Sequence, residues 1–166
     1  MACDAVQVRS TATMNFSTHT TSRIILATQR AIFRAFLDPE VIVNWRPPSG
    51  MTAEIHGFDP RPGGGYRMTL TYEDASIGTG KSAAERDVVL SRFIEIYPEE
   101  RIVESISFET KDPAFSGTMT LTTTMRPVTG GTKVTFLAEN VPVGIAEADH
   151  LKGMDSTLRN LANLLE

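Results

Sequence analysis

The sequence predicts an α+β domain in which an antiparallel sheet of about six to seven strands packs against one long C-terminal helix. Alternating apolar segments separated by turn residues fill the middle of the chain, which is typical of successive hairpins. Two short helical patterns follow the first strand. The C-terminal segment carries an apolar stripe with helical spacing. These three observations together favour a two-layer arrangement of one sheet and one covering helix.

The N-terminal segment is rich in Ser and Thr and poor in large apolar side chains. We expect residues 1–13 to form a flexible tail and residues 14–166 to form a single domain. The first strand is predicted around Arg23–Ala27, with a start near Met14. Thr28 is a suitable N-cap for a helix that begins at Gln29.

A second short helix is predicted directly after the first. Asp38 can cap it and Pro39 suits its first helical position. This helix should end near Trp45, since a Pro-rich loop follows.

A run of prolines and glycines at residues 58–66, Phe-Asp-Pro-Arg-Pro-Gly-Gly-Gly-Tyr, predicts a sharp corner in the chain. Apolar strand patterns flank it at Met51–Phe58 and Gly65–Tyr72. A glycine loop that binds phosphate leads into a helix, and no Lys-Ser or Lys-Thr pair follows these glycines. The corner is therefore interpreted as a hairpin connection and not as a nucleotide loop.

Further strands are predicted at residues 87–97, 101–109, 115–126 and 133–139, joined by turns at 98–100 and 129–131. Residues 74–85 resemble a long, flexible hairpin tip. The final helix, which begins between Gly144 and Ala148, carries its stripe at intervals of three and four residues. The stripe consists of Leu151, Met154, Leu158, Leu161 and Leu165.

Composition and charge exclude several classes of function. The net charge is −4 and the sequence pI about 5.4, so the chain lacks the basic surface of a nucleic-acid-binding protein. Cys3 is the only cysteine, which excludes an internal disulfide and a zinc site built from cysteines. No apolar stretch is long enough to span a membrane, and no signal segment precedes the domain. We expect a cytoplasmic protein without a metal or cofactor.

Four segments resemble a known family: residues 31–45, residues 58–66, residues 94–103, and residues 131–135 followed by 150–161. They are similar to the SRPBCC or START-like superfamily and, within it, to homologues of the C-terminal domain of the heat-shock protein 90 ATPase activator. The resemblance covers the chain from about Arg23 to its end. It implies the helix-grip fold, in which a curved sheet wraps around the C-terminal helix and leaves a space that takes apolar or aromatic molecules.

Methionine is frequent on the segments that would face this space. In the resembling family a tryptophan usually stands where this chain has Met154, so the floor of the pocket is expected to differ. Methionine side chains are polarizable and adaptable, which suits an irregular apolar ligand, although each could equally fill the core. The methionines concerned are Met51, Met68, Met119, Met125 and Met154.

Polar candidates for the site are few. Glu104 alternates in phase with Ile102 and Ile106, and Arg92 in phase with Leu90 and Ile94, so both are predicted to point inward unless a bulge shifts the register. They could pair across the sheet or hold a polar group of a ligand. His19, His56 and His150 show no metal-binding spacing, and His150 could bond with Glu147. The full set of predicted ligand-binding residues is Trp45, Met51, Phe58, Tyr66, Met68, Arg92, Glu104, Met119, His150, Met154 and Leu158.

Three functions are compatible with these residues. The first, which we favour, is the binding of a small apolar or aromatic molecule between sheet and helix. The second is an enzyme of the polyketide cyclase or dehydratase type, which would use polar groups in the same cavity; no G-x-S-x-G motif or other evident nucleophile supports it. The third is a chaperone-associated protein-binding module. Exposed strand edges also leave a homodimer possible.

Overall fold

The computed structural model describes residues 17–73 and 86–166, and the predicted tail, the predicted hairpin tip and Cys3 lie outside them. Among these described residues no helix is long and apolar enough to cross a membrane. In chain order the elements are β1 (Ser17–Ile25), α1 (Gln29–Ala35), α2 (Pro39–Trp45), β2 (Met51–His56), β3 (Gly65–Tyr72), β4 (Arg86–Tyr97), β5 (Arg101–Phe108), the short 3-10 helix η1 (Pro113–Phe115), β6 (Thr118–Val128), β7 (Gly131–Val141) and α3 (Glu147–Leu165).

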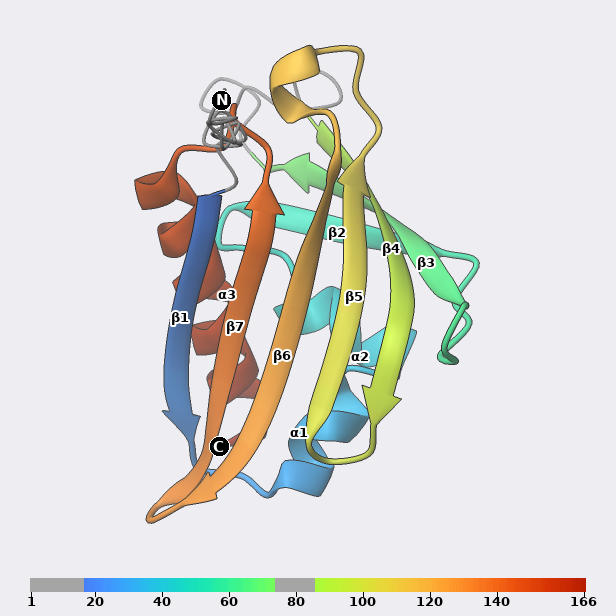
Figure 1. Ribbon diagram of the computed structural model, residues 1–166. Helices are drawn as coiled ribbons and strands as arrows, with labels where there is room; N and C mark the ends of the chain where they lie inside the picture. Colours follow the sequence, from blue (N-terminus) through green and yellow to red (C-terminus); the bar gives the residue numbers. More distant parts are fainter. Residues whose placement is uncertain (1–16, 74–85) are drawn as a thin grey trace, which may run out of the picture.

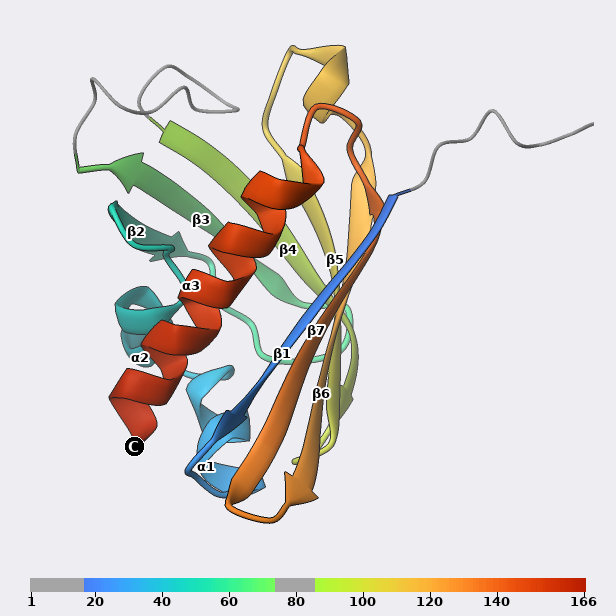
Figure 2. The same cartoon turned by 90° about the vertical axis from the view of Figure 1, so that its left-hand side faces the viewer.

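The seven strands form one antiparallel sheet in the order β1-β7-β6-β5-β4-β3-β2 (Figure 1). The sheet curves around α3, with β1 and β7 on one side of the helix and β2 and β3 on the other (Figure 2). Helices α1 and α2 lie at the end of the sheet where α3 ends. The α+β class and the helix-grip arrangement predicted from the sequence are confirmed.

The two short helices begin where their caps predict. Thr28 accepts a hydrogen bond from the backbone N–H of Ala31, and Asp38 accepts one from that of Glu40. Pro39 occupies the start of α2, where its missing N–H costs nothing. Because a local cap fixes the start of each helix, the caps also fix the position of Trp45 and of the residues that follow it.

The glycine corner joins β2 to β3, as the sequence predicts. Gly63 has a φ of +87°, which favours glycine, and a Cβ on Gly65 would lie 2.0 Å from the carbonyl oxygen of Ser91. The Gly63 N–H donates to the carbonyl of Phe93 at 2.7 Å, and the Phe93 N–H donates to the carbonyl of Gly64 at 2.9 Å. The glycines therefore allow a close approach of the corner to β4.

Helix α3 buries the predicted stripe most deeply in its C-terminal half, at Leu158 and Leu161. Polar contacts fasten the helix to β1: Thr21 bonds Asp155, and the N–H of Leu26 donates to Glu166 at 3.0 Å. On its other side Thr157 donates to the carbonyl of Arg46 at 3.0 Å. The helix is thus held to edge strand β1 on one side and to the residue after α2 on the other.

The sixth strand starts later than predicted. Residues 113–115 form η1 instead of the start of a strand, because Asp112 caps that turn and Pro113 occupies its first position. From Thr118 onward the predicted alternation is confirmed, with Met119, Leu121, Thr123 and Met125 all buried.

Candidate functional site

A cavity of about 570 Å³ lies between the inner face of the sheet and α3. Strands β2 to β7 form one wall, and the N-terminal half of α3 forms the other. The loop before α3 and Phe115 of η1 contribute to the lining at one end. The cavity exists because the large side chains of α3 that pack onto the core, Leu158 and Leu161, belong to its second half.

The lining is mainly apolar. Every strand from β2 to β7 supplies at least one apolar side chain, and Met154 supplies another from α3. Such a surface gains free energy when an apolar molecule displaces water from it. The larger apolar side chains of the lining are Met51, Met68, Leu70, Val89, Ile106, Phe108, Phe115, Met119, Leu121, Phe136, Ile145 and Met154.

A cluster of four polar side chains lies at this mainly apolar wall. Arg46, the residue that follows α2, donates from Nη2 to Glu104 Oε2 at 3.0 Å. Ser91 Oγ donates to Glu104 Oε1 at 2.9 Å, and the Tyr66 hydroxyl donates to the same oxygen at 3.3 Å. Arg46, Ser91 and Tyr66 line the cavity, whereas Glu104 lies behind them and is almost fully buried. Glu104 therefore organises three side chains that a ligand can reach.

The electrostatics of the cluster keep its donors protonated. Burial is the strongest influence on the pKa of Tyr66 and raises it well above its ordinary value, so the phenol keeps its proton. Burial alone would lower the pKa of Arg46, but the charges of Glu104 and Tyr66 and the hydrogen bond to Glu104 outweigh it and raise the pKa. Arg46 is thus a permanent cation at the cavity wall.

A pair of histidines lies on the α3 side of the cavity. His150 of α3 lines it, and its Nδ1 is hydrogen-bonded to Nδ1 of His19 at 2.8 Å. His19 belongs to β1 and is buried. The two rings meet edge to face with their centroids 5.1 Å apart. This contact fixes the first turn of α3 to the edge of the sheet.

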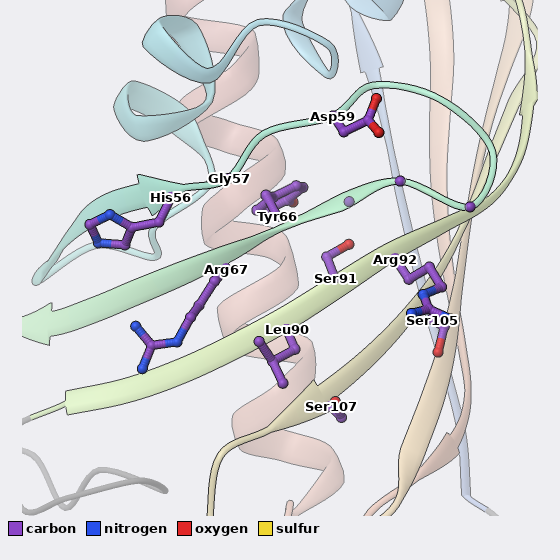
Figure 3. Close-up of a pocket in the computed structure, with 13 residues that line it drawn as sticks. His56, Gly57, Asp59, Tyr66, Arg67, Leu90, Ser91, Arg92, Ser105 and Ser107 are labelled. Carbon is purple, nitrogen blue, oxygen red and sulfur yellow. The ribbon is translucent and has the colours of Figure 1, made fainter.

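A second hollow, of about 630 Å³, lies on the outer face of the sheet beside the glycine corner (Figure 3). Arg67, Leu90, Arg92, Ser105 and Ser107 line it together with the backbone of the glycines. Arg67 is already bound to Glu109 through two hydrogen bonds. We take the inner cavity as the candidate site, because it combines an apolar wall with a buried polar cluster, as ligand sites do.

The structure brings six of the predicted residues to the inner cavity: Met51, Tyr66, Met68, Met119, His150 and Met154. Trp45 is fully buried below it and donates from Nε1 to the carbonyl of Ala35 at 3.1 Å. Phe58 stacks beside Tyr66 with ring centroids 5.4 Å apart, and Leu158 is packed in the core. These three side chains support the cavity without lining it.

Arg92 is placed differently from the sequence expectation. Because β4 bulges between Phe93 and Glu95, residues before the bulge alternate out of phase with Ile96. Arg92 is therefore exposed on the outer face with Leu90 and does not pair with Glu104. Arg46 forms the ion pair with Glu104 instead.

The residues predicted for the site did not include Arg46 or His19, although the sequence contains a signal for each. A buried carboxylate requires a cationic partner, and Arg46 stands where capped α2 ends. His19 lies within the first strand as predicted from a start near Met14, and strand alternation places it in phase with the buried Ile25. Their partners Glu104 and His150 are 58 and 131 residues away, a distance that local patterns do not bridge.

Comparison with known proteins agrees with this architecture. A family model described as activator of Hsp90 ATPase homolog 1-like protein matches residues 26–166. The chain belongs to this family. The sequence resemblance is thereby confirmed, while no curated protein matches the chain.

Solved structures show the same fold. Protein CV1439 from Chromobacterium violaceum is 28% identical, with 90% of this chain and 96% of that chain covered and a TM-score of 0.78. Mll3558 from Rhizobium loti is 26% identical, with 90% and 97% covered and a TM-score of 0.68. Ms6760 from Mycobacterium smegmatis is 20% identical, with 90% of each chain covered and a TM-score of 0.69, and shows the fold alone.

Proposed function

We propose that this member of the family binds a small apolar or aromatic molecule in the cavity between the sheet and α3. The observation that supports the proposal most strongly is the size and lining of that cavity. Its volume of about 570 Å³ falls within the usual range of small-molecule sites, and its apolar side chains come from six strands and the helix. Binding there would stabilise the folded protein, by about 2.7 kcal/mol when the ligand concentration is a hundred times the dissociation constant.

Native mass spectrometry of the purified protein tests this proposal. We expect an adduct of one small molecule that is released on denaturation and whose mass identifies its chemical class. A protein that arrives without ligand should instead show a raised melting temperature with a series of apolar compounds. A bare mass and no thermal shift with any compound at high concentration would reject the proposal.

The cyclase or dehydratase alternative draws on the polar cluster in the same cavity. We rank it second, because Glu104, the carboxylate that could act as acid or base, already accepts bonds from Arg46, Ser91 and Tyr66 and lies behind the lining. Incubating the released molecule with fresh protein separates the two functions. Unchanged mass and unchanged chromatographic retention support binding alone; a lower mass supports dehydration, and the same mass with a new retention time supports cyclisation. The chaperone-associated alternative rests on the family description only, and we do not propose it.

A further inference from the structure

The arginine at the cavity wall has more hydrogen-bond donors than the protein satisfies. A guanidinium carries five N–H groups, and the side chain of Arg46 donates one bond, from Nη2 to Glu104. Nε and Nη1 have no acceptor among the residues that the structure describes. The side chain is 9% exposed and lines the cavity, so the space available to these donors is the cavity itself.

The guanidinium is also held in a defined position. Its central carbon lies 5.6 Å from the ring centroid of Trp45 and 5.8 Å from that of Phe36. The backbone carbonyl of Arg46 accepts a hydrogen bond from the Thr157 hydroxyl of α3, which also holds the residue in place. Donors fixed in this way lose little freedom when an acceptor arrives, so they contribute to affinity and orientation.

The charge of the cluster discriminates between acceptors. Arg46 and Glu104 already form a close ion pair, so the cluster has no net positive charge to offer a ligand. A carboxylate ligand that reached Arg46 would approach the Glu104 carboxylate within the poorly solvated cavity, where like charges repel strongly. An uncharged oxygen accepts the same N–H groups without that repulsion.

From these contacts we infer that the ligand is an uncharged molecule with an apolar body and an oxygen acceptor, such as a ketone, an ester or a phenol, and that Arg46 binds this oxygen. The inference rests on the proposed function and adds the chemical class of the ligand. The Tyr66 hydroxyl belongs to the same cluster, but its single O–H donates to Glu104 at 3.3 Å, so Arg46 supplies the free donors. The apolar body then lies against Met68, Met119 and Met154.

Equilibrium dialysis with three probes that share one aromatic body tests the inference. The probes are naphthyl methyl ketone, ethylnaphthalene and naphthoate. The wild-type protein should bind the ketone about tenfold to a hundredfold more tightly than ethylnaphthalene, and naphthoate less tightly than the ketone. Equal binding of the ketone and ethylnaphthalene, or tightest binding of naphthoate, would overturn the inference while leaving the proposed function intact. Binding of none of the three would overturn the inference, whereas the proposed function is rejected only by the mass spectrometry and thermal-shift results described above.

Two variants test whether Arg46 causes the preference for the ketone. In the double variant Arg46→Met/Glu104→Gln the preference for the ketone should fall to about onefold, whereas ethylnaphthalene still binds; a preserved preference would contradict the role of Arg46. Arg92→Met is the matched control, because it removes an exposed arginine from the outer face, and it should leave all three affinities unchanged. Should the double variant fail to fold, the comparison of the three probes on the wild-type protein still tests the inference.

Discussion

Thr123 on β6 is buried, and within the described part of the chain its hydroxyl has no hydrogen-bond partner. An unsatisfied buried hydroxyl lowers stability, while the shape of the side chain matches that of valine. We therefore expect Thr123→Val to raise the free energy of unfolding by about 1 kcal/mol. Urea denaturation measures the change. A loss of stability would mean that the hydroxyl is satisfied in solution.

Met154 stands where the sequence resemblance leads us to expect a tryptophan. It lines the cavity from α3, so a larger ring there would occupy space that a ligand needs. We expect Met154→Trp to fold and to weaken the binding of naphthyl methyl ketone at least tenfold, with Met125→Leu as the control in the core. Unchanged affinity in the tryptophan variant would place the ligand elsewhere.

At the scale of the element, α3 combines a packed C-terminal half with an N-terminal half that faces the cavity. Gly153 lies in this first part and lines the cavity, and apart from its chain neighbours and the backbone of its own helix no atom lies within 4 Å of the position that a Cβ would occupy. Glycine in the middle of a helix costs roughly 0.5–1 kcal/mol relative to alanine. We expect Gly153→Ala to stabilise the protein by that amount in urea denaturation. A destabilised variant would show that the helix packs more closely on the sheet than the cavity implies.

The sequence predicts well those elements whose signals lie within a few residues of one another along the chain. Caps at Thr28 and Asp38 locate α1 and α2, and the apolar stripe locates α3, because each signal acts within a few residues. The bulge after Phe93 leaves no comparable trace, yet it decides that Arg92 faces outward. Part of the candidate site was predictable for the same reason: strand alternation places Met68 and Met119 in its lining.

The polar part of the site depends on distant contacts. Glu104 meets Arg46 and His150 meets His19 only after the sheet has curved around α3. Tertiary packing sets these distances, so periodicity in the sequence cannot supply them.

The homodimer suggested by the exposed strand edges stays a prediction, with β1 and β2 as the edges of the described sheet.

At the scale of the whole molecule, the methionines provide a direct test of where the ligand binds. Met51, Met68, Met119 and Met154 line the cavity, whereas Met125 is buried in the core away from it. The most direct measurement is a nuclear magnetic resonance titration of isotope-labelled methionine methyl groups with naphthyl methyl ketone. We predict that the signals of the four lining methionines shift together and saturate at one ligand per chain, while that of Met125 stays in place. Saturable binding without shifts at these four residues would contradict the proposal that the space between sheet and helix is the binding site.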